Sequence, residues 1–231
     1  MKRLLSLIIA LFLVTCNFNV LLYAEETVPV SDIVELDINE EGVERAFTYY
    51  SYEDNRHYLV KVYDDKIDVL NADTLEVVLS AERRKGPELS LNQNALLSEN
   101  MGEQISINGI YDGEDAWSDW AYVRQDSLYI SDEPSTISEI VGILCGEFAK
   151  LTTELAFTIA SAVYNNRYQG VYAKIYRKIN KYCGILQIEQ YRYFYNGTTT
   201  SAGEETYGPS WFGNPWDYTQ PAACRVLAQT Y

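Results

Sequence analysis

Residues 136–166 have the sequence TISEIVGILCGEFAKLTTELAFTIASAVYNN, and the plan of the whole protein follows from them. Thr136 and Glu139 have the spacing of a capping box, in which a hydroxyl and a carboxylate each accept a bond from a free backbone N–H group of the first turn. Two asparagines end the pattern before Gly170. The polar residues fall within one arc of the helix, so most of its circumference is apolar and needs a cover.

The apolar surface of such a helix can be buried in two ways. The helix can be the central helix of a core and pack on a sheet of the same protein. Alternatively, it can be released to insert into a membrane or to pack against copies of itself. Charged residues interrupt the run, so it is not a standard transmembrane span. The small residues that would permit close helix packing are Gly142, Gly146, Ala156 and Ala160, and the apolar surface offered to lipid includes Phe157 and Ile159.

The charge of the chain divides at this helix. Residues 25–140 contain 27 acidic and 8 basic residues, a net charge of −19, whereas residues 141–231 contain 6 acidic and 8 basic residues, a net charge of +2. With Lys2 and Arg3 near the N-terminus, the whole chain of 231 residues has a net charge of −15. This asymmetry predicts two parts with different surroundings or partners. The overall negative charge argues against nucleic acid as a partner.

The N-terminus has the layout of a secretory signal peptide. Lys2 and Arg3 precede an apolar run, and Ala24 stands immediately before acidic sequence. We therefore expect residues 1–24 to be removed by cleavage after Ala24 and the protein to be secreted to the extracellular space. Lipidation at Cys16 and an uncleaved membrane anchor are the alternatives. Thr15 fits a lipoprotein signal poorly, and the interrupted run is shorter than the ~20 residues of a spanning helix.

Residues 25–130 are expected to form an acidic, β-rich domain. Between Val43 and Ser80, short strand-like runs alternate with polar turns, which predicts an antiparallel meander with one buried and one solvated face. Near the end of this part, carboxylates crowd around Gly113 in a pattern that offers oxygen ligands to Ca²⁺. Their spacing differs from that of an EF-hand loop, so a solvated acidic loop is the favoured explanation. These carboxylates are Asp112, Glu114, Asp115 and Asp119.

Residues 131–231 are expected to form a second domain, in which the helix is followed by a tyrosine-rich hairpin and an aromatic tail. The alternating pattern predicts exposed faces rich in Tyr and Lys, with Leu186, Ile188 and Phe194 on the buried side of the second strand. Rings beside cations suit an anionic membrane surface or a cell-wall sugar polymer, and they also occur on ordinary exposed sheets. The predicted contact residues are Tyr172, Lys174, Tyr176, Lys178, Tyr191, Tyr193 and Tyr195.

Three cysteines remain after the expected cleavage. In an oxidising compartment an odd number leaves one pair and one free thiol, or no pair. A disulfide between Cys183 and Cys224 is favoured, because one lies at a turn and the other in the C-terminal tail. Three free thiols are the alternative. Cys145 falls within the apolar helix and is expected to be a buried hydrophobic residue.

These features predict an α+β protein: an acidic antiparallel β-meander, then one long apolar helix packed on a Tyr-rich antiparallel hairpin sheet. Catalysis is not expected, and neither is a metal or another cofactor. His57 is the only histidine, and the chain has no phosphate-binding glycine loop and no dinucleotide fingerprint. A glycosidase, which needs only two carboxylates, is the least favoured alternative.

As an architecture, the signal peptide, the acidic half, the apolar segment 136–166 and the Tyr/Lys hairpin 171–195 resemble the precursors of large, unmodified secreted bacteriocins of Gram-positive bacteria, of the geobacillin type. The resemblance implies killing of related bacteria through their membrane, with no cofactor and no catalytic residues.

Two functional hypotheses follow. The first is a bacteriocin-like, membrane-active antibacterial protein, in which the acidic half keeps the apolar half soluble and opposes premature binding to anionic lipid. The second is a non-catalytic secreted surface protein, whose aromatic sheet binds a cell-wall polymer or another protein.

Overall fold

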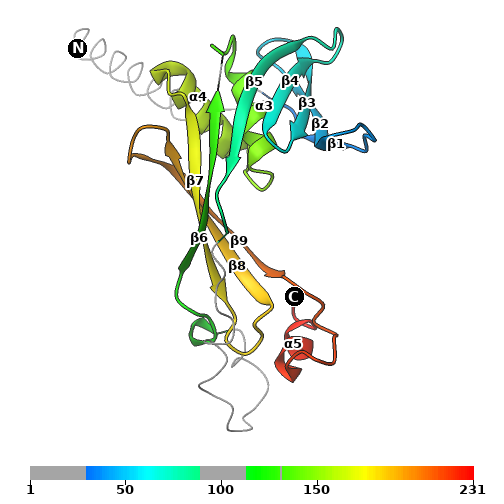
Figure 1. Ribbon diagram of the computed structural model, residues 1–231, viewed down its shortest axis with the longest axis vertical. Coiled ribbons are helices and arrows are strands. Elements are labelled where there is room, and N and C mark those ends of the chain that lie inside the picture. Colours follow the sequence, from blue (N-terminus) through cyan, green and yellow to red (C-terminus); the bar gives the residue numbers. More distant parts are fainter. Residues whose placement is uncertain (1–29, 89–112, 131) are drawn as a thin grey trace, which may run out of the picture.

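The computed structural model describes residues 30–88, 113–130 and 132–231. The expected signal peptide and Asp112 lie outside the described residues. The fold is α+β, as the sequence predicts, and the strands of the described residues belong to one nine-stranded antiparallel sheet in the order of the chain (Figure 1). The sheet continues across the domain boundary expected after residue 130, because β6 pairs with β7.

The first five strands are connected by short turns and loops: β1 (Val34–Leu36), β2 (Val43–Ser51), β3 (Arg56–Tyr63), β4 (Lys66–Asn71) and β5 (Val77–Lys85). The 3-10 helix η1 (Glu114–Ala116) precedes β6 (Ala121–Ile130), and helices α3 (Ile137–Glu147) and α4 (Thr153–Asn166) separate β6 from β7 (Gly170–Ile179). β8 (Leu186–Tyr195), β9 (Ser201–Trp211) and α5 (Ala222–Leu227) complete the chain. Figure 1 shows β6–β9 extending as a long twisted ribbon away from α3 and α4 toward α5.

The prediction of a single helix over residues 136–166 is wrong. The capping box at its start is present, because the Glu139 backbone N–H donates to Thr136 Oγ1 and the Thr136 N–H donates to a Glu139 carboxylate oxygen. Phe148 has a non-helical backbone, and its ring meets Tyr193 with a centroid distance of 5.2 Å. The break at 148–152 lets α3 and α4 pack on each other, so a surface that is apolar almost all round is covered from two sides.

The main core lies between these helices and one face of the sheet. α3 packs on β2, β3, β4 and β5, whereas α4 packs on α3 and β9 (Figure 1). Gly142 and Gly146 face the sheet, since a Cβ atom would lie 2.7 Å from Tyr49 Oη at the first and 3.1 Å from Ile67 Cγ2 at the second. Ala156, Ala160 and Ile159 are fully buried in the same core, and Phe157 is partly buried against it.

A second, smaller cluster lies at the far end of the ribbon. Cys183 and Cys224 form a disulfide there, the pair that the sequence favours, and Cys145 is a buried free thiol. The disulfide joins α5 to the turn before β8, and the aromatic residues Trp117 and Trp211 pack around it. This cluster therefore has its own apolar interior, separate from the main core.

We expect Gly142→Ala to destabilise the protein by about 1–3 kcal/mol, because the new methyl group has to displace Tyr49 from its hydrogen bond with the Ser138 carbonyl. Urea denaturation followed by fluorescence measures the change. Gly213→Ala is the matched control. At that site the nearest atom to a Cβ is 3.6 Å away, so a change within about 0.5 kcal/mol is expected. Equal stabilities of the two variants would contradict the helix-to-sheet packing.

Candidate functional site

The two faces of the β7–β8 pair differ in character. Val171 pairs with Tyr195, Ala173 with Tyr193 and Ile175 with Tyr191. All six point to the side that carries α3 and α4, which we call the helix face. The alternate residues point to the opposite side, which we call the open face. Its cross-strand pairs are Tyr172 with Phe194, Lys174 with Arg192, and Tyr176 with Gln190.

The prediction that Tyr191, Tyr193 and Tyr195 share an exposed face is therefore wrong. Tyr193 is 0 % exposed, Tyr195 is 8 % exposed, and Tyr191 packs against the main core. Side chains alternate along β8 as expected, but the face predicted to be exposed is the buried one, and the face predicted to be buried is the open one. The reason is that Leu186 is buried in the second cluster rather than in the main core. Because Leu186 is apolar and lies on the open face, the sequence pattern wrongly indicated that this face is buried against the main core.

The open face carries rings and cations in contact with each other. The Tyr172 and Phe194 rings stack with centroids 5.1 Å apart, and Lys174 Nζ lies 5.3 Å from the Phe194 centroid. The Arg192 guanidinium lies 4.7 Å from the centroid of Tyr176. Each cation is thus held over a ring by a neighbouring strand, which orders long side chains that would otherwise move freely.

Two further aromatic residues extend this face: Tyr122 on β6, which the sequence analysis did not select, and Trp120, which immediately precedes β6. Tyr122 is 41 % exposed and meets the Tyr176 ring edge-on at 5.8 Å. Lys178 Nζ lies 4.9 Å from the Trp120 ring. The β6–β7 register places Tyr122 beside the hairpin, although more than 50 residues separate it from Tyr176 in the chain. Strict alternation from Arg124 would place Tyr122 on the helix face, and the register shift between Tyr122 and Arg124 brings it to the open face.

The open face is also locally basic. Over β5–β9 it presents four basic side chains and two acidic ones, in a chain whose net charge is −15. The acidic ones are Glu82, which pairs with Arg84, and Glu204, whose carboxylate is 3.5 Å from Arg192. The basic ones are Arg84, Lys174, Lys178 and Arg192. An acidic ligand would find attraction here and repulsion over most of the remaining surface.

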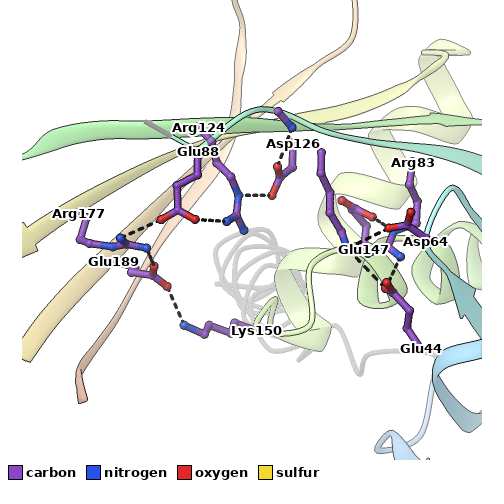
Figure 2. Close-up of polar contacts among 12 residues, drawn as sticks. Glu44, Asp64, Arg83, Glu88, Arg124, Asp126, Glu147, Lys150, Arg177 and Glu189 are labelled. Carbon is purple, nitrogen blue, oxygen red and sulfur yellow. Dashed lines mark hydrogen bonds and ion pairs between the residues drawn. The ribbon is translucent and has the colours of Figure 1, made fainter. Parts of the chain in front are cut away.

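On the helix face, a network of ion pairs continues beyond the main core (Figure 2). Glu189 on β8 accepts hydrogen bonds from Lys150 Nζ and Arg177 Nη2, each at 2.9 Å. Arg177 and Arg124 both approach Glu88, and Arg124 also bonds Asp126 at 3.0 Å. Lys150 lies in the connection between α3 and α4, so the network anchors that connection to the sheet. Three cations here face three anions, which gives the network a structural role.

The surroundings of Glu189 lower its pKa. Burial by itself raises the pKa of this carboxyl group, but the hydrogen bonds and charges of Lys150 and Arg177 outweigh it and bring the pKa below its ordinary value of 4.5. The ionised form is therefore favoured in the folded state. Its contribution to stability is present above the ordinary carboxyl pKa and is lost as the pH falls through the lower folded value.

We expect Glu189→Gln to lower the free energy of unfolding by about 2 kcal/mol at pH 7, since two charged hydrogen bonds lose their anion. The difference from the unmodified protein should shrink as the pH falls below 4.5. Urea denaturation across this pH range tests both parts. Glu204→Gln, at a side chain that is 62 % exposed, should have almost no effect at any pH. A pH-independent loss in Glu189→Gln would contradict this account of the network.

Metal ligands require a grouping of several acidic, Cys or His side chains around one point. In residues 30–88, 113–130 and 132–231, no three His, Cys, Asp or Glu side chains gather as metal ligands would. His57 is exposed on β3, with its ring 4.8 Å from that of Tyr50. Of the helices in the same part of the chain, none has the length and hydropathy needed to cross a bilayer.

Comparison with known proteins found no matching family model, no similar curated protein and no similar solved structure.

Proposed function

We propose that this is a secreted, non-catalytic binding protein whose open face holds an anionic, sugar-containing polymer of the cell wall. The observation that carries the proposal is the alternation of rings and cations on the uncovered face of β6–β8. The central contacts are those of Lys174 with Phe194 and of Arg192 with Tyr176. The matching chemistry is a chain of sugar rings that bears phosphate or carboxylate groups.

Each group on this face has a counterpart in such a polymer. Tyr and Phe rings offer flat apolar surfaces on which the C–H faces of sugars can lie, and the Tyr hydroxyl can hydrogen-bond to sugar hydroxyls. Lys174 and Arg192 are cross-strand neighbours and offer two positive charges to an anionic group, although Arg192 also lies 3.5 Å from the Glu204 carboxylate. A long, shallow sheet surface suits an extended polymer better than a compact ligand. Binding should weaken with added salt, because these charges are exposed.

The membrane-active hypothesis makes a different use of the same chain. It requires α3 and α4 to leave the core and contact lipid through residues such as Phe157 and Ile159. Ile159 is fully buried, and α3 is covered by both the sheet and α4. Release would therefore cost the burial energy of several large side chains, each about 1.5–3 kcal/mol. Polymer binding through the open face leaves both helices in place and has no such cost.

We expect Lys174→Ala combined with Arg192→Ala to weaken binding to polymer-bearing cell walls about tenfold or more and to reduce its salt dependence. Tyr176→Ala should weaken binding without changing the salt dependence. Sedimentation with purified Gram-positive cell walls, with and without their anionic polymers, measures both. Tyr52→Ala and Arg56→Ala are controls, because both residues are exposed at the other end of the sheet and should leave binding unchanged.

Equal binding to walls stripped of anionic polymer would contradict the proposed ligand. Dye release from anionic lipid vesicles by the whole protein, unaffected by the Lys174/Arg192 double variant, would instead support the membrane-active hypothesis. The same preparations serve both assays, so the two functions are compared on one set of proteins.

A further inference from the structure

The open face ends in a hollow at its α4 end. There the connection from α4 to β7, residues 167–169, runs beside the end of β6, where the Ile130 N–H donates to the Gln169 carbonyl oxygen. Two adjoining cavities of about 480 and 570 Å³ share Tyr129, Arg167, Tyr168 and Gln169 in their walls. Volumes of this size are typical of sites for small ligands. Since Tyr172 lines the smaller cavity, that cavity continues directly into the rows of rings on the open face.

The smaller cavity is lined by rings, amides and a hydroxyl, and it has little charge. Among its described lining residues Arg167 is the one charged side chain, and its guanidinium is paired with Glu133 at 2.6 Å. Side chains of this kind bond neutral hydroxyls and stack on sugar rings, and they offer little to a phosphate. The hydrogen-bonding groups come from Gln125, Ser127 and Gln169, and the rings are Tyr129, Tyr168 and Tyr172.

The walls of the cavity are held in place before any ligand binds. Gly170 has φ +132°, and a Cβ there would lie 2.0 Å from the Leu128 carbonyl oxygen, so only glycine lets β7 start this close to β6. Asn196 Nδ2 donates to the same carbonyl at 2.8 Å. The Tyr168 ring stacks on the buried Tyr195 ring with centroids 4.5 Å apart. A rigid wall lowers the entropy lost on binding.

Two polar groups in this wall are free to meet a ligand. Within the described part of the chain, neither the Gln169 side-chain amide nor the Tyr129 hydroxyl has a hydrogen-bond partner. The Arg84 guanidinium lies 4.6 Å from the Tyr129 centroid and fixes the ring without using its hydroxyl. An amide supplies both a donor and an acceptor, which is what a sugar with several hydroxyls requires.

We propose that this cavity binds one neutral pyranose unit of a glycan, by stacking on its tyrosines and bonding to Gln169 and Tyr129. The inference rests on the proposed function for the source of the glycan, as a wall polymer whose anionic groups lie along the open face. The cavity would thus select the type of sugar, and the basic open face beside it would attract the anionic groups of the polymer.

The test is calorimetric titration of the whole protein with three neutral tetrasaccharides, built from β-linked N-acetylglucosamine, β-linked glucose and α-linked glucose. We expect one of them to bind with a Kd of about 1 mM or tighter, with little dependence on salt. Gln169→Ala and Tyr129→Phe should each weaken it about fivefold or more, and both leave the packing of Tyr168 intact. The Lys174/Arg192 double variant should bind the saccharide as the unmodified protein does.

The cavity proposal is overturned if none of the three saccharides binds, or if Gln169→Ala and Tyr129→Phe bind as tightly as the unmodified protein. Its failure is distinct from failure of the proposed function. If the protein binds walls through Lys174 and Arg192 but binds no saccharide, only the cavity proposal is contradicted. If it binds a saccharide but not the walls, the cavity proposal stands and the proposed wall-polymer ligand is contradicted.

Discussion

In the described part of the chain, α3 and α4 cover one face of the sheet, and over β6–β8 the other face stays open. α3 and α4 lie in the connection between β6 and β7, two strands that pair directly, so both helices end up on the same side. The apolar residues of the strands gather on that side, as the fully buried Ala173 and Tyr193 show. The opposite face has to tolerate water, and over β6–β8 it does so with rings that carry cations above them.

Beyond the ends of the helices, ion pairs take the place of apolar contacts on the helix face. Arg83 and Glu147 form a buried ion pair between β5 and the end of α3, and Lys150 reaches from the helix connection to Glu189. Buried pairs gain little net stability, because both ions lose their water, but the loss of one partner is costly. These pairs therefore define where the helices sit. A sheet with its helices held in this way presents its open face as a rigid surface.

The local parts of the fold could be predicted from the sequence, and the relations between distant parts could not. The capping box at Thr136 and the antiparallel pattern of the early strands are properties of neighbouring residues, and both are present. The break at Phe148 depends on how two helices share one core, which their periodicity does not reveal. The predicted buried and exposed faces of β8 are the reverse of those in the structure, because Leu186 belongs to a second apolar cluster. On β7, Tyr172, Lys174, Tyr176 and Lys178 occupy the open face.

Cys145 provides the most direct measurement, because it reports whether α3 stays in the core. Its free thiol is 2 % exposed on α3, and burial raises its pKa to about 12, so it should resist thiol reagents while the helix is packed. The labelling rate of Cys145 should be followed in the whole protein alone, with polymer-bearing cell walls and with anionic lipid vesicles. Binding through the open face predicts that Cys145 stays unlabelled in all three while the walls hold the protein. Rapid labelling on contact with walls or vesicles would show that the helices leave the core, and it would contradict this account.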